Sequence, residues 1–196
     1  MAIGVDDLGK IIGPLGDLKD LLQKLLSSED DKKKAEVNTF IEIDGIDGES
    51  DQKGQDKKIE VLDFHWGVTQ PRSASASAQT AERAHFGDLT IYKLMGKASP
   101  GLAHACASGK RLKKAKLEIR LPRGKDNIRL LHSEYELFDV IITSDRTGSR
   151  GFGEGIFLEE VSLSYNKITW RHLKKDVKDN TQSADAERAW DLKTNK

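Results

Sequence analysis

Hydrophobic and polar residues alternate along most of the chain after the first 36 residues, which is the pattern of half-buried β-strands. The clearest segment is Lys114–Leu121, in which every second residue is apolar: Ala115, Leu117, Ile119 and Leu121. Six further segments are similar or shorter: Phe40–Ile43, Ile59–Val68, Leu89–Leu94, Tyr135–Ile142, Val161–Trp170 and Ala189–Leu192. Turn signals separate these segments and no regular helices intervene, which argues against a parallel α/β fold.

One short helix is predicted within this β-rich region, at Ser99–Gly109. Ser99 is a residue type that caps a helix N-terminus, Pro100 suits the first helical position, and Gly109 is suited to end the helix. Its apolar residues can pack on a sheet. The residues alone therefore predict a β-barrel or a β-sandwich with one short helix.

The first 36 residues have leucine and isoleucine at helical spacing instead. Pro14 interrupts this spacing, so we expect a short helical turn over residues 7–12 and a second helix capped by Asp17. The apolar face of the second helix consists of Leu18, Leu21, Leu22, Leu25 and Leu26. A polar run at residues 27–34 follows. The predicted organisation is an amphipathic N-terminal extension with a linker (1–36) and one β-domain (37–196).

Composition and charge exclude several classes of protein. The 196 residues include 32 basic and 32 acidic side chains, so no net positive field exists to hold nucleic acid or an anionic membrane. The single Cys106 excludes an intramolecular disulfide framework and a cysteine-cluster metal site. No apolar run approaches the roughly 20 residues that span a bilayer, and Asp6 and Asp7 are unlike a signal peptide. We therefore expect a soluble protein made in the cytoplasm.

The histidines and the cysteine give no pattern of a metal or catalytic site. No His-x-His or His-Glu-x-x-His spacing occurs, and His104 and Cys106 are two residues apart, which places them on different faces of a helix. The glycine-rich segment 148–155 follows a strand, but another strand pattern comes next, so it lacks the helix N-terminus that binds phosphate. We interpret it as a loop between strands.

Charged residues are better explained by solvation than by chemistry. Glu134 and Glu136 could form a carboxylate pair with Asp139, yet they alternate with apolar residues as the solvated face of a strand does. The basic run Lys110–Lys116 lacks aromatic residues that stack on bases, so a solvated rim or a contact with an acidic partner subunit is the better interpretation. No catalytic residue, cofactor or metal site is predicted.

From about Val37 to its end, the sequence resembles the Hcp family, the haemolysin-coregulated proteins of the type VI secretion tube. The resemblance is carried, in the family's order, by a strand-and-turn at 40–50, a strand ending in Trp-Gly, the segment 88–117, and Val161-Ser162-Leu163 with the terminal Ala-Trp-Asp-Leu. The individual motif residues are Trp66, Gly67, Asp88, Lys93, Ser99, Pro100, Gly109, Lys110 and Trp190. The loop after Trp66-Gly67 is rich in Ser and Ala where relatives are often Gly-rich, and the first 36 residues have no counterpart in compact members.

The resemblance implies two antiparallel sheets that close into a β-barrel with a short helix at the side. It further implies homohexameric rings that stack into a tube, which a contractile sheath propels behind a spike protein and which can carry effector proteins. Such a protein is no enzyme, needs no cofactor, binds no nucleic acid and does not insert into membranes. It is assembled in the cytoplasm and then exported to the extracellular space or a target cell.

Two further expectations follow from the resemblance. The loop from Gln70 to Phe86 is expected to contribute to stacking between rings, with these candidate contacts: Gln70, Arg72, Ser75, Ser77, Arg83 and Phe86. Lys116, Glu118 and Arg120 form a polar row that faces either the lumen or the outside.

The extension allows several hypotheses: it docks on the tube domain or on a neighbouring protomer, binds a partner, sits in the lumen, or is a mostly disordered tail. The leucine density disfavours full disorder. The alternative functions are the tube of another contractile particle, such as a phage tail or an extracellular injection device, and a monomeric binding β-sandwich.

Overall fold

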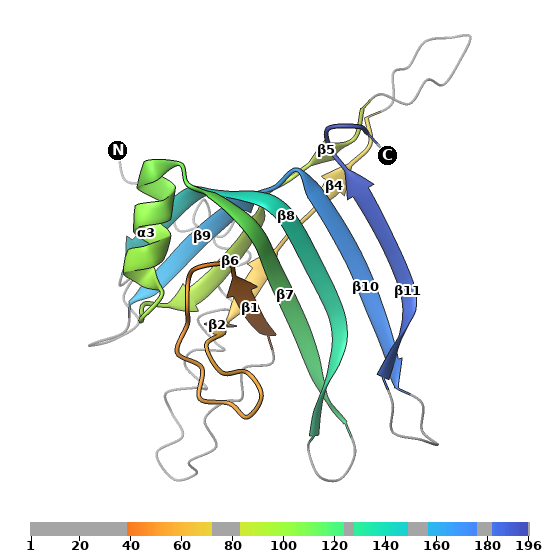
Figure 1. The fold of residues 1–196 in the computed structure, drawn as a ribbon, viewed down its shortest axis with the longest axis horizontal. Coiled ribbons are helices and arrows are strands. Elements are labelled where there is room, and N and C mark those ends of the chain that lie inside the picture. The colour runs from red at the N-terminus through yellow and green to blue at the C-terminus, as the bar shows by residue number, and fades with distance from the viewer. Residues whose placement is uncertain (1–38, 72–82, 124–127, 149–156, 176–181, 196) are drawn as a thin grey trace, which may run out of the picture.

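The structure, a computed structural model, describes residues 39–71, 83–123, 128–148, 157–175 and 182–195. The predicted extension and its leucine face lie outside the described residues. Within them the chain forms eleven strands and one helix (Figure 1). The elements are β1 (Thr39–Ile43), β2 (Ile59–Val61), β3 (Asp63–His65), β4 (Val68–Thr69), β5 (His85–Phe86), β6 (Leu89–Leu94), α3 (Ser99–Ser108), β7 (Arg111–Arg123), β8 (Ile128–Gly148), β9 (Leu158–Ser164), β10 (Lys167–Lys175) and β11 (Gln182–Asp191).

Nine strands form one antiparallel sheet, in the order β2-β1-β7-β8-β9-β6-β3, with β10 paired to β8 and β11 to β10. The strands β4 and β5 form a separate two-stranded sheet. The mainly-β, antiparallel prediction is confirmed. The described strands do not close into a hydrogen-bonded barrel, however. The segment 59–65 instead lies at both ends of this strand order, because β2 pairs with β1 at one end and β3 pairs with β6 at the other.

The long strand β8 bends at Asp139, and this bend turns the sheet back on itself. Residues 133–138 of β8 pair with β10, whereas residues 141–148 pair with β9. Asp139 has a φ of 54°, a left-handed conformation that Asp and Asn adopt more readily than most residues. Its carboxylate accepts bonds from Arg111 (2.8 Å), Lys193 (3.0 Å) and the Asn166 amide, and these lower the pKa of Asp139 to about 2.

Two predicted strands are each divided in the structure. Val161–Trp170 consists of the ends of β9 and β10, joined by a turn at Tyr165 and Asn166. The alternation extends to Tyr165, which is buried in the core, and it resumes at Ile168 one position out of phase. Ile59–Val68 is divided into β2, β3 and β4, since the chain changes partner strand where the Leu62 amide donates to the Tyr92 carbonyl (2.8 Å).

The core lies between the two parts of the folded sheet and includes Ile41, Leu117, Leu137, Leu163 and Ile168, all fully buried. The helix α3 lies against β8 and buries Leu102 and Ala105 in the same core. No helix of the described ranges is long and apolar enough to cross a membrane.

The predicted N-cap of the helix is wrong, whereas its end is confirmed. Ala98 is the N-cap and has no side-chain group that can make a capping bond, while the Ser99 hydroxyl bonds to Lys93 and Glu159. Pro100 lies in the first turn as expected, and Gly109 ends the helix in the left-handed conformation with φ 60°.

The prediction that Leu121 belongs to the core face is only partly right. It follows Leu117 and Ile119 at strand spacing, but its side chain is 45% exposed. The reason is that β1 ends its pairing at Ile119, so β7 continues beyond the covered part of the sheet.

Candidate assembly surfaces and the polar face of the sheet

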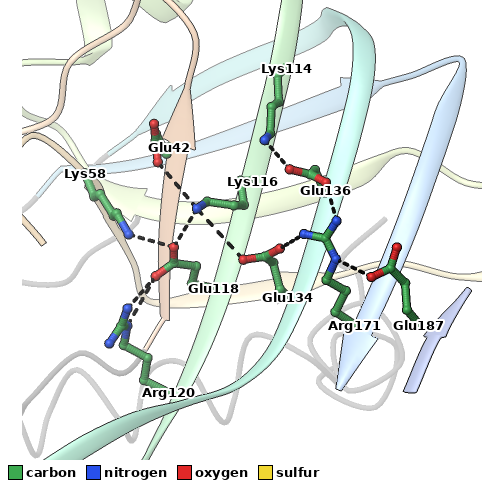
Figure 2. Close-up of polar contacts among 10 residues, drawn as sticks. All are labelled: Glu42, Lys58, Lys114, Lys116, Glu118, Arg120, Glu134, Glu136, Arg171 and Glu187. Atoms are coloured by element: carbon green, nitrogen blue, oxygen red, sulfur yellow. Dashed lines mark hydrogen bonds and ion pairs between the residues drawn. The ribbon is translucent and has the colours of Figure 1, made fainter. Parts of the chain in front are cut away.

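The side of the sheet that faces away from the core carries a continuous lattice of ion pairs, here called the polar face (Figure 2). It is formed by five acidic and five basic side chains: Glu42, Glu118, Glu134, Glu136, Glu187, Lys58, Lys114, Lys116, Arg120 and Arg171. Most of them alternate with core residues on β1, β7, β8, β10 and β11. Because the signs are balanced, the lattice is electrically neutral as a whole.

Glu118 is the best-connected carboxylate of the polar face. It is 3% exposed and accepts bonds from Lys58 (2.7 Å), Lys116 (3.1 Å) and Arg120 (2.8 Å). Burial alone would raise the pKa of Glu118, but the three cations outweigh burial and lower the pKa to about 2. Burial likewise opposes the charge of Lys116, yet its acidic neighbours raise its pKa overall. The three side chains of the predicted polar row are therefore joined to one another by ion pairs.

Glu134 and Glu136 are not the solvated strand face that their alternation indicated. Both side chains are nearly buried, and the Arg171 guanidinium on β10 bridges them at 2.7 and 3.3 Å. Lys114 also pairs with Glu136, and Arg171 continues the lattice to Glu187 on β11 at 2.8 Å. These cations lie one strand away in space but far away in sequence, which is why the local pattern did not reveal them.

The strand β11 forms a long edge of the sheet. Among the described strands it pairs only with β10, and residues 184–189 along it are exposed. The backbone N–H and C=O groups on the outer side of such a strand are available to pair with another chain. This edge is a candidate contact between copies of the protein.

The predicted stacking loop is only partly within the described residues. Arg72, Ser75 and Ser77 lie outside them. Gln70 directly follows β4 and Arg83 lies just before β5, and both side chains are exposed. The Arg83 guanidinium donates to the Leu192 carbonyl.

Phe86, the last candidate of the loop, belongs to an aromatic cluster. Its ring stacks on Trp170 and Trp190, with centroid distances of 6.4 and 6.1 Å. Trp66 contacts Phe86 and Trp170, and its indole N–H donates to the Tyr165 hydroxyl. The structure thus brings together two motif tryptophans that are 124 positions apart in the sequence. Burial raises the pKa of Tyr165 to about 12.

A second buried polar group joins β6, β9 and the start of α3. Lys93 pairs with Glu159 and donates to the Ser99 hydroxyl (3.0 Å), which in turn donates to Glu159 (2.6 Å). Asp145 on β8 lies beside Glu159, and burial together with the charge of Glu159 raises the pKa of Asp145 to about 6. Two carboxylates facing one ammonium favour retention of a proton on Asp145.

The motif residues Asp88, Gly67 and Lys110 each take part in a hydrogen bond. The Thr143 hydroxyl donates to Asp88 (2.5 Å), the Gly67 carbonyl accepts from the Gly87 amide (2.9 Å), and the Lys110 amide bonds to the Ala105 carbonyl (3.0 Å). His104 is exposed and Cys106 is half-buried. Within the part of the chain that the structure describes, no group of three or more His, Cys, Asp or Glu could hold a metal ion.

Residues 40–172 match the family described as "Type VI secretion system effector, Hcp". The chain belongs to the Hcp family. An Hcp relative, "Protein hcp1" of Pseudomonas aeruginosa, is 29% identical over 160 residues, which cover 81% of this chain and 97% of the relative. The "Major exported protein" of the same organism is 30% identical over 131 residues, covering 64% of this chain and 74% of that protein.

Solved structures agree with the Hcp assignment. The chain is similar to a type six secretion system protein with a TM-score of 0.72 at 27% identity, covering 82% of this chain and 99% of that one. It is also similar to Hcp1 from Salmonella typhimurium, with a TM-score of 0.63 at 29% identity, covering 81% of this chain and 96% of that one. The protein is thus a tube or effector component of type VI secretion.

Proposed function

We propose that this Hcp protein forms homohexameric rings that stack into a tube, which a contractile sheath propels behind a spike and whose lumen carries effector proteins. It assembles in the cytoplasm and leaves the cell through the type VI machinery, consistent with its similarity to an exported protein. We propose no catalytic role, no cofactor, no nucleic-acid partner and no membrane insertion. The family match favours this function over a different contractile particle or a monomeric binding module.

The outer edge of β11, with which no other described strand pairs, is the observation that carries the ring proposal. A head-to-tail ring needs two different, complementary surfaces on each subunit, and an unpaired strand supplies one of them with directional backbone bonds. The strand is long, exposed along residues 184–189, and held in place by β10 through nine residue pairs. Pairing of this edge with the next subunit would extend the sheet from copy to copy.

In such a ring we assign the polar face to the lumen. The polar face spans five strands, β1, β7, β8, β10 and β11, and six copies with strands about 4.8 Å apart would enclose a channel on the order of 45 Å across. Lys116, Glu118 and Arg120 would line it with charges that are already paired within the subunit. A neutral, internally satisfied lining would admit effectors of either net charge. The loop between Gln70 and Phe86 would contact the next ring.

Native mass spectrometry with negative-stain imaging of the full chain tests the proposal. We expect annular particles of about six times the 21.8 kDa chain mass. A strict monomer at high concentration would contradict ring formation. The edge itself is tested by the double substitution Ala184→Lys/Ala186→Lys, which adds lysines along β11 and should abolish the rings.

A matched control places two lysines on exposed alanines of α3, as Ala103→Lys/Ala107→Lys. The added charge is the same, and we expect the rings to persist. Loss of rings in the α3 variant but not in the β11 variant would show that the edge assignment is wrong.

A further inference from the structure

The β7–β8 hairpin projects beyond the rest of the sheet (Figure 1). The pairing of β1 with β7 ends at the pair Thr39–Ile119, and that of β10 with β8 ends at the pair His172–Ser133. Beyond these points, residues 120–123 of β7 and residues 128–131 of β8 pair only with each other among the described strands. This part of the hairpin therefore has no neighbouring described strand on either side within the sheet.

One face of the projecting hairpin is apolar. Leu121 lies directly across from Leu130, and it follows Ile119 at the two-residue spacing of the core face. Leu121 is 45% exposed, and Leu130 and Ile119 are half-buried. The core face of the sheet therefore continues outward as an apolar strip, here called the hairpin strip, consisting of Ile119, Leu121 and Leu130.

The chain enters the described structure beside this strip. Thr39 is the first described residue and the Cα partner of Ile119, and β1 runs antiparallel to β7. The N-terminal end of β1 therefore points in the direction in which Arg120 and Leu121 continue β7. The leucine stripe of residues 18–26 is only 13 residues before Thr39, a distance that extended chain covers up to about 40 Å.

The length of the predicted helix also matches that of the projecting strand. A helix over residues 17–26 would be about 15 Å long, and the projecting strand from Ile119 to Arg123 is about 13 Å long. The segment 17–26 contains two acidic and two basic residues, so the match rests on apolar character and length and not on charge. A leucine-striped segment therefore ends 13 residues before Thr39, the Cα partner of Ile119 in an apolar strip of similar length.

We propose that the leucine stripe of the N-terminal extension docks on the hairpin strip of its own chain. The extension then acts as an additional layer that completes the core where β1 ends. This inference does not depend on ring formation, because the segment and its surface belong to one protomer. A second exposed apolar patch, formed by Leu94, Met95 and Phe157, lies at the ends of β6 and β9 and is the competing surface.

Cysteine cross-linking tests this proposal in the full chain, in a Cys106→Ser background that removes the single native thiol. Leu22→Cys is combined with Leu121→Cys, and in the control with Met95→Cys, whose side chain is equally exposed. A short bismaleimide is added, and the products are separated on denaturing gels and mapped by mass spectrometry. We expect an intrachain cross-link of the 22–121 pair at least several-fold above that of the 22–95 pair.

Three results would overturn the proposal: no cross-link at 121, equal cross-linking at 95, or a cross-link at 121 found only between chains. The last result would assign the strip to the extension of a neighbouring copy. Hydrogen exchange gives a second measurement without cysteines. Deletion of residues 1–36 should speed the exchange of amides 119–121 several-fold and leave those of β9 unchanged. Unchanged exchange in the hairpin would also overturn the proposal.

Discussion

The removal of a single negative charge from the polar face should destabilise the subunit measurably. In Glu118→Gln the size of the side chain is kept, but Lys58, Lys116 and Arg120 lose their shared carboxylate. The pKa of Glu118 falls from its ordinary 4.5 to about 2, a difference equivalent to about 3 kcal/mol. Because the three cations are 14–24% exposed, solvent screening reduces this value, and we expect about 1–2 kcal/mol.

The pH dependence has a defined sign. The folded-state pKa of Glu118 lies below its unfolded-state value, so its stabilisation is complete above pH 4.5 and is lost as the pH falls towards 2. Urea unfolding of the wild type and Glu118→Gln should therefore differ at pH 7, and the difference should shrink at pH 3. Both proteins are compared at equal concentration and oligomeric state, because assembly itself adds apparent stability.

Glu187→Gln is the matched control. Glu187 belongs to the same lattice, but its side chain is 49% exposed and, among the described residues, it forms an ion pair only with Arg171. A surface pair of this kind contributes at most about 1 kcal/mol and often less. Equal free energies of unfolding for Glu118→Gln and the wild type at pH 7, or an equal loss in both variants, would refute the view that burial makes Glu118 the centre of the lattice.

Three further predictions concern the scaffold. The raised pKa of Asp145 makes the stability of the wild type fall as the pH rises from about 4 to 6, whereas Asp145→Asn lacks this titrating group. In urea unfolding, the stability of Asp145→Asn relative to the wild type should therefore be higher at pH 7.5 than at pH 4.5. A difference that does not depend on pH would contradict this. Gly48→Ala should lower the melting temperature strongly, since a Cβ there would overlap the Lys58 carbonyl, whereas Gly67→Ala, with nothing within 4 Å, should not; similar melting temperatures would be inconsistent with the packing described. At the bend of β8, Asp139→Asn should melt above Asp139→Ala, because Asn tolerates a positive φ and keeps an acceptor; the reverse order would show that the bend does not depend on this residue.

Much of the fold was predictable from local pattern. The strand Leu89–Leu94 has the predicted limits, and the end of α3 at Gly109 follows from the left-handed conformation that glycine adopts readily. The predictions were wrong where a side chain bonds to a residue that is distant in the sequence. Ser99 does not cap its own helix, because its hydroxyl bonds to Lys93 and Glu159.

The candidate site was less predictable than the fold. Lys116, Glu118 and Arg120 were identifiable as a polar row, since a period of two places them on one face. Lys58, Arg171 and Glu187, which complete the lattice, were not, because cross-strand partners depend on register and strand order. The same holds for Trp66 and Trp190, which are far apart in sequence and share one aromatic cluster through Phe86 and Trp170.

The sequence by itself determined which residues face together, where the helix ends, and to which family the chain belongs. Alternation and glycine chemistry are local, so they need no knowledge of the partner strand. The tertiary structure decided what lies across from each face. It folded β8 at Asp139, buried Glu134 and Glu136 against Arg171, and left Leu121 exposed beyond the end of β1. Burial and pairing depend on contacts between distant segments, and only the folded chain brings these segments together.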